Sequence, residues 1–182
     1  GSYVDEDLGI LGIKSSSQAL TAEQARVFGF ETPAADWSTS NGGAVLGTSG
    51  ISSQGTTALS VLSNGWTEID SVSLSSLGTS KDTATIDIRL PETVYSGEVR
   101  IILVFPSKGV WWLEAGSASI SGLSPNSYHT LSFSLSTDAK NLISSSYSDL
   151  KIKVVVNAPR LSSPYLIDNL VLVEDVSPDT AF

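Results

Sequence analysis

Two adjacent tryptophans, Trp111 and Trp112, are the residues whose type and spacing indicate most about chemistry. Successive side chains of a β-strand point to opposite faces, and Leu113 and Ala115 share the parity of Trp111. We therefore predict that Trp111 points into the core and that Trp112, with Glu114, points outward. An exposed indole offers a flat apolar surface to the C–H face of a pyranose ring, while nearby polar groups bond the hydroxyls. Trp112 and Trp111 are therefore candidate contacts with a sugar. The alternatives are that Trp112 only caps a hydrophobic edge, or that a bulge inverts the two directions.

Other polar and aromatic residues have outward parity on neighbouring predicted strands. Asp87 and Arg89 are two residues apart and share a face, and Tyr128 has the outward parity of its own strand. With Asn157, such side chains would bond sugar hydroxyls, and an arginine fork would bind a uronate carboxylate. The alternative is a solvated surface of mutually paired charges, which contributes little. The remaining members of this polar set are Arg100, Lys151 and Lys153.

The composition excludes several kinds of chemistry. The 182 residues include no Cys and a single His, His129, so disulfides, thiolate nucleophiles and multi-histidine metal sites within the chain are excluded. Ten Lys and Arg against nineteen Asp and Glu give a net charge of -9, the wrong sign for nucleic acid or anionic membranes. No apolar run approaches the roughly 18 residues of a membrane-spanning helix. Nucleophile-elbow, P-loop, dinucleotide-binding and H-E-x-x-H motifs are also missing from the sequence.

Short strands must position these residues. From Val27 onward, apolar-alternating runs recur roughly every 8 to 15 residues between Gly, Ser, Asn and Pro clusters, which is typical of an all-β sandwich. Residues 101–105 and 154–156 are apolar at both parities, so we expect central strands whose outer face is covered or forms an apolar floor. We predict about ten strands in two packed antiparallel sheets, drawn from 27–31, 43–47, 57–63, 66–74, 83–90, 98–105, 110–115, 117–121, 128–136, 150–157 and 165–174. Trp37 and Trp66 are expected in the core or at its margin.

The first 26 residues differ from the rest of the chain. They have an acidic start and a run of serines, and then Thr21 and Gln24 at capping-box spacing, so we expect a linker with one helical turn. The leading Gly1-Ser2 without an initiating Met is typical of a tag remnant, and we expect that any export signal was cut away. We predict an N-terminal extension at 1–26, a sandwich at 27–176 and a tail at 177–182.

Four stretches form an ordered set from about residue 27 to 174: Phe28-Gly29-Phe30-Glu31 followed by Trp37, the run Gly55 to Val61, the run Gly65 to Ile69, and the run Tyr165 to Leu172. In this order they resemble the β-sandwich (jelly-roll) carbohydrate-binding modules of bacterial glycoside hydrolases, polysaccharide lyases and related secreted proteins. The resemblance implies a two-sheet antiparallel jelly roll whose first and last strands lie together. It also implies a structural Ca²⁺ near that junction, and a sugar-binding surface on the concave sheet or in the loops at one edge.

Glu31 and Asp168 match the positions that supply calcium ligands in the modules that the chain resembles. Calcium takes about six to eight oxygen ligands, and the two carboxylates would converge if the first and last strands are neighbours. Asp168 also interrupts an otherwise apolar run, and a buried carboxylate needs a cation or several hydrogen-bond donors. We therefore expect a calcium ion on Glu31 and Asp168. The alternative is a carboxylate satisfied by N–H groups of a neighbouring loop.

These observations predict a non-catalytic carbohydrate-binding module, secreted or on the cell surface of a bacterium, that targets an attached enzyme or surface protein to polysaccharide. We expect a monomer within a larger multidomain protein, and the negative charge favours a neutral plant or algal glycan. Two other classes stay open. One is an adhesion or spacer domain, which a buried Trp112 would favour. The other is a lyase, which would need Tyr128 and His129 to act together despite their opposite parity, or a glycosidase with a pair such as Asp87 and Glu114.

Overall fold

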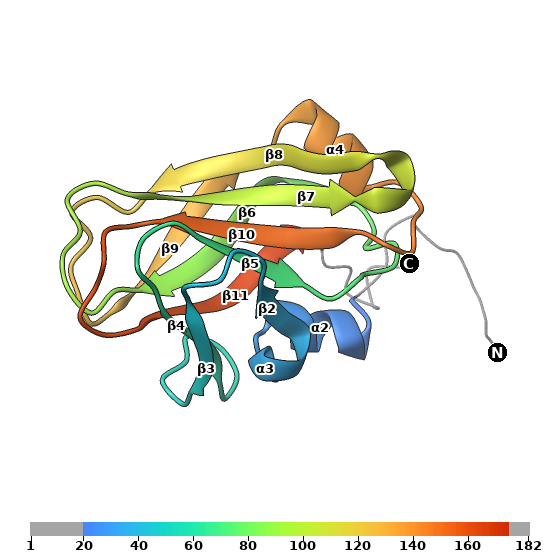
Figure 1. Ribbon diagram of the computed structural model, residues 1–182. Helices are drawn as coiled ribbons and strands as arrows, with labels where there is room; N and C mark the ends of the chain where they lie inside the picture. The colour runs from blue at the N-terminus through green and yellow to red at the C-terminus, as the bar shows by residue number, and fades with distance from the viewer. Residues whose placement is uncertain (1–19, 175–182) are drawn as a thin grey trace.

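The computed structural model describes residues 20–174, in which ten strands form two antiparallel sheets of five (Figure 1). We call the first of them, as given below, the front sheet and the second the back sheet. The front sheet has the order β2 (Trp37–Thr39), β5 (Thr67–Ser71), β10 (Lys151–Asn157), β7 (Glu98–Phe105) and β8 (Val110–Ser119). The back sheet has the order β3 (Val45–Ser49), β4 (Ala58–Leu62), β11 (Tyr165–Val173), β6 (Ser80–Arg89) and β9 (Tyr128–Ser134).

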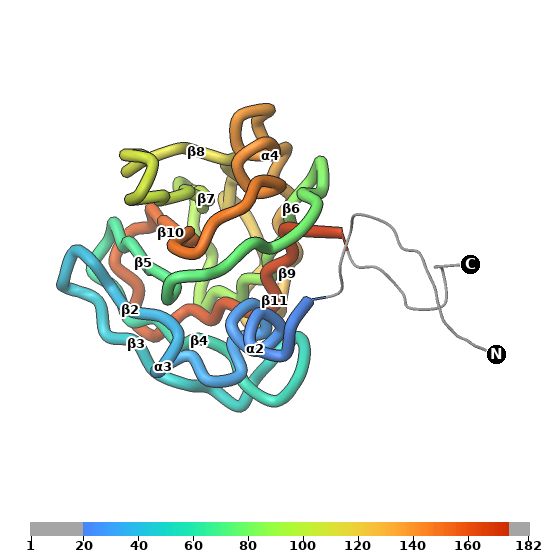
Figure 2. Tube along the Cα trace, turned by 90° about the vertical axis from the view of Figure 1, so that its right-hand side faces the viewer, coloured from blue at the N-terminus to red at the C-terminus, as the bar shows by residue number. Residues whose placement is uncertain are grey.

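Short helices close the sides of the sandwich. They are α2 (Ala22–Phe28), α3 (Pro33–Asp36), the 3₁₀ turn η2 (Pro106–Lys108) and α4 (Thr137–Ile143). Figure 2, which looks nearly along the strands, shows the two sheets as two layers, with α2 beside β11 and α4 beside β8. The predicted capping box is present at the start of α2, because Thr21 Oγ1 accepts from Gln24 N at 3.1 Å and Gln24 Oε1 accepts from Thr21 N at 3.2 Å. Between residues 20 and 174, no helix is long and apolar enough to span a membrane.

The core lies between the two sheets and follows the predicted alternation. On β7 and β10, β-branched and aromatic side chains suit a pleated surface that is covered on both sides. Their inward residues are Val99, Ile101, Leu103, Phe105, Ile152, Val154 and Val156. On the opposite side of the same strands, Ile102, Val104 and Val155 form a second, separate apolar cluster. The double-sided apolar pattern thus correctly indicated central strands with an apolar outer face.

The structure corrects three expectations about the chain path. Residues 27–31 do not form a strand, because the capped helix α2 continues to Phe28 and the chain then turns, with Phe30 at a φ of 52°. The two runs predicted at 110–115 and 117–121 are one strand, β8. Of the described strands, the first, β2, pairs with β5 rather than with β11, so the expected pairing of first and last strands is not seen among them. Most of the predicted extension (1–19), the end of the predicted sandwich (175–176) and the tail (177–182) lie outside the described residues.

Candidate functional site

A β-bulge on β8 exposes both adjacent tryptophans. Between the pair Leu103–Leu113 and the pair Phe105–Val110, β8 has one residue more than β7. An extra residue breaks the strict alternation of side chains at that point. Trp111 is 65% exposed and Trp112 is 45% exposed. The prediction that Trp111 points into the core is therefore wrong, whereas the outward direction of Trp112 is confirmed.

Trp66 is a third exposed tryptophan on the same side of the molecule. It is 40% exposed, and its Nε1 donates to Glu68 Oε2 at 2.9 Å. Its expected place in the core or at its margin is wrong. A continuous strand over 66–74 would give Trp66 the parity of the buried Leu74, but β5 ends at Ser71, so that alternation does not extend to Leu74. Within β5, Thr67 is buried and points inward, so Trp66 points outward with Glu68 and Asp70.

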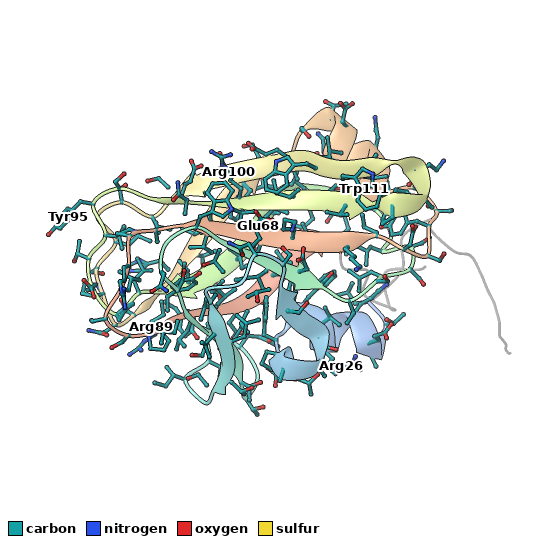
Figure 3. All side chains as sticks on the ribbon, viewed as in Figure 1. Arg26, Glu68, Arg89, Tyr95, Arg100 and Trp111 are labelled. Carbon is teal, nitrogen blue, oxygen red and sulfur yellow. The ribbon has the colours of Figure 1, made fainter. Side chains whose placement is uncertain are left out.

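A cation lies over the ring of each of two of these tryptophans. Lys153 Nζ is 5.8 Å from the ring centroid of Trp112, and Arg100 Cζ is 5.8 Å from the ring centroid of Trp66. At this range a cation is attracted by the negative face of the indole. Figure 3 shows Arg100 and Glu68 on the front sheet, and Trp111 further along β8 toward the turn from β7. The charged side chains therefore hold the two rings in defined positions.

Lys153 is the buried cation of this face. It is 7% exposed, and its Nζ lies 2.9 Å from Glu68 Oε1 and 3.0 Å from Asp70 Oδ1, and donates to Ser40 Oγ at 2.9 Å. Burial alone would lower the pKa of Lys153, but the hydrogen bonds and charges of Glu68 and Asp70 outweigh burial and raise it. Burial opposes ionisation of Glu68 as well, yet Lys153 and the indole of Trp66 bring the pKa of Glu68 below its ordinary value. Lys153 and Glu68 are therefore ionised at neutral pH.

Lys153→Met should lower the free energy of unfolding by about 2 to 3 kcal/mol near neutral pH, because it leaves two partly buried carboxylates without their cation. The folded-state pKa of Glu68 lies below the ordinary 4.5, so its contribution is present above that pH and is lost as the pH falls through the folded value. The pKa of Lys153 lies above 10.5, so its contribution is lost only as the pH rises through the folded value. Urea unfolding should show a stability gap near pH 7 that shrinks near pH 3. An equal gap at both pH values would contradict the network.

Arg100 is held between two carboxylates. Its Nε and Nη2 contact Glu98 Oε2 on the same strand, and its Nη1 lies 3.5 Å from Glu114 Oε1 on β8. The side chains of Arg100 and Glu98 are about a third exposed, and that of Glu114 is 44% exposed. Glu114 thus lies on the outer face of the front sheet, as predicted. Asn157, exposed at the end of β10, has the same outward parity as Lys153.

The other predicted ligand residues lie on the opposite face of the sandwich. Asp87 and Arg89 are on β6 and Tyr128 is on β9, both strands of the back sheet. The structure therefore does not bring them together with Trp112, Glu114 and Asn157 in one site. Parity within a strand tells which side a residue takes, but not which of two sheets the strand joins.

Two of these back-sheet residues are engaged by the loop between β3 and β4, residues 50–57, which we call the covering loop. Asp87 is 8% exposed, and its carboxylate accepts from Ser53 Oγ at 2.6 Å and from Thr130 Oγ1 at 2.7 Å. Tyr128 Oη donates to Ile51 O at 2.6 Å. Burial, aided by the negative charge of Asp168, raises the pKa of Tyr128 to about 12. Asp87 and Tyr128 therefore hold a loop in this structure.

Asp168, on β11, binds the backbone of the same covering loop. It is fully buried, and its Oδ2 accepts from Ser53 N at 2.8 Å and Gln54 N at 3.0 Å, while its Oδ1 accepts from Asn169 N at 2.8 Å. Burial raises the pKa of Asp168, an effect that these N–H groups oppose without cancelling it.

Glu31 fixes the far end of the covering loop. Its Oε1 accepts from Thr56 N at 2.9 Å and from Thr56 Oγ1 at 2.8 Å, and these contacts lower the pKa of Glu31. Gly55 has a φ of +65°, and a Cβ there would lie 2.3 Å from Glu31 Oε2. Only glycine therefore lets the loop approach the carboxylate this closely.

The expected calcium ligands Glu31 and Asp168 thus accept hydrogen bonds from one loop. In residues 20–174, no group of three or more His, Cys, Asp or Glu side chains is placed to hold a metal ion. A calcium ion at these two carboxylates would need oxygen atoms of the loop where N–H groups now point. Calcium binding stays a prediction.

Comparison with known proteins bears on the fold. No family model and no curated protein matches the sequence. A carbohydrate-binding module specific for non-crystalline cellulose has a TM-score of 0.55 and 15% identity, over 76% of this chain and 87% of that one. A structure on the promiscuous specificity of carbohydrate-binding modules from the β-sandwich superfamily has a TM-score of 0.52 and 13% identity, over 91% and 65% of the two chains. A carbohydrate-binding module joined to a xylanase catalytic module of Clostridium thermocellum, in complex with xylohexaose, has a TM-score of 0.53 and 9% identity, over 76% and 26%. The chain has the β-sandwich fold of carbohydrate-binding modules.

Proposed function

We propose that the outer face of the front sheet binds a polysaccharide chain without catalysis. The observation that carries the proposal is a pair of exposed tryptophans, Trp66 and Trp112, each fixed by a charged neighbour. A ring that is already fixed loses little conformational entropy when a sugar stacks on it. Beside the rings, the oxygens of Glu68 and Glu114 accept hydrogen bonds from sugar hydroxyls, and the amide of Asn157 donates and accepts.

An apolar layer supports these groups. Ile102, Val104 and Val155 lie on the outer side of the front sheet, yet each is at most 8% exposed. By register their neighbours on this face are Arg100, Lys153 and the two tryptophans of β8. The surface that a ligand meets therefore consists of indole rings and hydrogen-bonding groups on a closely packed base, which suits a polyol.

The spacing of the rings favours a chain over a single sugar. Trp66 precedes Thr67, which is level with Val156, so Trp66 is level with Asn157 and through it with Glu98. Trp112 precedes Leu113, which pairs with Leu103, so Trp112 is level with Val104. Six residues of strand amount to about 20 Å, and the three inter-strand spacings from β5 to β8 amount to about 14 Å. Two platforms at this separation are suited to several consecutive sugar rings, and the exposed Trp111 extends the surface beyond them.

The shared fold supports polysaccharide as the ligand class, because the similar structures include modules for non-crystalline cellulose and a xylanase with bound xylohexaose. The exposure of Trp112 favours sugar binding over a spacer role. Asp87 and Glu114 lie on opposite faces of the sandwich and cannot flank one glycosidic bond, as a glycosidase would require. The pair considered for a lyase is engaged elsewhere, because His129 Nε2 is 2.8 Å from Ser124 O at the sheet margin and Tyr128 Oη donates to Ile51 O. In this proposal the domain is a monomeric targeting module of a larger secreted or cell-surface bacterial protein.

Native affinity electrophoresis tests the proposal. Gels containing xylan, mixed-linkage β-glucan, a soluble cellulose derivative or mannan should retard the domain in at least one case, relative to a gel without polymer. Unchanged mobility in every gel would contradict polysaccharide binding and favour a spacer or adhesion domain.

A further inference from the structure

We propose that Glu98 and Glu114 make this face selective for uncharged sugar chains, because they occupy the guanidinium of Arg100 that a uronate carboxylate would otherwise bind. The inference rests on the proposed function of the same face and names the class of chain that it takes. It assigns these two glutamates a role in specificity.

All three nitrogens of the Arg100 guanidinium face carboxylates of the protein. Nε and Nη2 are directed at Glu98, and Nη1 is directed at Glu114. A guanidinium binds carboxylates through its paired N–H groups, and a ligand carboxylate would have to compete for both edges of this fork. Arg100 also lies over the ring of Trp66, so a sugar stacked on that ring would have its substituents close to this ion triplet.

The second cation of the face is equally occupied. Lys153 contacts Glu68 and Asp70 and is 7% exposed. The two cations that lie over indole rings are thus surrounded by four carboxylates. The resulting local excess of negative charge repels a polyanion at distances up to the screening length, about 8 Å in physiological salt.

Lys151 is the remaining cation with outward parity on β10, and within residues 20–174 it has no ion pair or hydrogen bond through its side chain. It pairs with Val104 at the end of the strand, away from Trp66. A single ammonium acts as a point charge without the fork geometry of arginine. It is therefore a useful control position for residual binding of anionic chains.

The same carboxylates favour hydroxyl ligands. Each ionised carboxylate has about four lone-pair sites, so Glu98 and Glu114 can contact Arg100 and still accept from sugar O–H groups. A carboxylate on the ligand has no proton to donate and meets only acceptors at these positions. Repulsion of the wrong ligand and bonding of the right one thus come from the same two side chains.

The test compares the double variant E98Q/E114Q with the control E23Q/D82N, which changes the net charge equally but at α2 and at the exposed Asp82 on β6. Dissociation constants are measured by affinity electrophoresis at low salt, in polygalacturonate and in the neutral polymer that retards the wild type. We expect the wild type and the control to pass through polygalacturonate freely. E98Q/E114Q should be retarded by it, with a dissociation constant at least about tenfold below the lower limit that free passage sets for the wild type, because a charge-assisted hydrogen bond becomes available. Adding Arg100→Met should remove this gain, whereas adding Lys151→Met should not.

Two results would overturn the inference: retention of the wild type by polygalacturonate, or free passage of a folded E98Q/E114Q variant. Failure of the proposed function gives a different result. If no neutral polymer retards the wild type, that function is wrong. A gain of polygalacturonate binding in E98Q/E114Q that depends on Arg100 would still show that the glutamates occupy the guanidinium.

Discussion

Trp112→Ala should weaken binding of the retained polysaccharide by about tenfold to a hundredfold. Lys153 lies over the partly exposed indole of Trp112, and burying such a side chain against a sugar contributes about 1.5 to 3 kcal/mol. The ring lies on the outer face of the front sheet and is no part of the core, so the melting temperature should stay close to that of the wild type. Isothermal titration with a soluble oligosaccharide of the retained polymer measures the effect.

Tyr95→Ala is the matched control for this prediction. Tyr95 is 84% exposed, and Figure 3 shows it at the end of the sandwich opposite the β7–β8 turn. Loss of this aromatic should leave the dissociation constant within about twofold of the wild-type value, since scattered exposed residues contribute little. Equal effects of the two substitutions would contradict a site centred on Trp112.

Asp168→Ala should lower the free energy of unfolding by about 3 kcal/mol or more, because three N–H groups lose a buried acceptor. Those groups belong to Ser53, Gln54 and Asn169, so the covering loop would lose its anchor. Asp168→Asn should be milder, since the amide oxygen still accepts and the cost of burying a charge disappears. Urea unfolding near pH 7 measures both changes.

Asp168→Ala should change stability without changing binding, because Asp168 lies in the back sheet. The folded fraction of Asp168→Ala should therefore bind polysaccharide like the wild type. A variant as stable as the wild type would contradict the role of Asp168 in holding the loop. Loss of binding in a fully folded variant would contradict the placement of the site on the front sheet.

Melting scans of the wild type test the calcium prediction at Glu31 and Asp168. If calcium binds the folded state, added calcium should raise the melting temperature and a chelator should lower it, by mass action. Identical melts in both conditions would contradict calcium binding. They would agree with a covering loop held by hydrogen bonds of the protein itself.

Strand β7 shows what local sequence can predict. Its apolar run lies between Gly97 and Pro106, and its bounds at Glu98–Phe105 agree with the prediction because both limits are local signals. The outward direction of Trp112 was also predictable, because the alternation with its neighbour Leu113 is a local signal. Trp111 was misplaced because the bulge depends on how β8 pairs with β7, and the alternation of β8 alone does not reveal that register.

The candidate site was only partly predictable, because it combines strands that are distant in sequence. Asp87 shares outward parity with the front-sheet residues but belongs to the other sheet, and strand assignment depends on the whole topology. The network of Lys153 with Glu68 and Asp70 joins β10 to β5, across more than 80 residues. The outward direction of Trp66 was predictable from its own sequence, because Glu68 and Asp70, which share its parity, alternate with buried residues on β5.

The most direct test of the account follows the four indole N–H signals by ¹⁵N NMR while an oligosaccharide of the retained polymer is added. Trp37 provides an internal reference, because it is 3% exposed and its Nε1 donates to Val27 O at 3.0 Å. We predict that the signals of Trp66 and Trp112 shift in proportion to binding, while that of Trp37 does not move. Saturation of binding without movement of the Trp66 and Trp112 signals would contradict a sugar site on the front sheet.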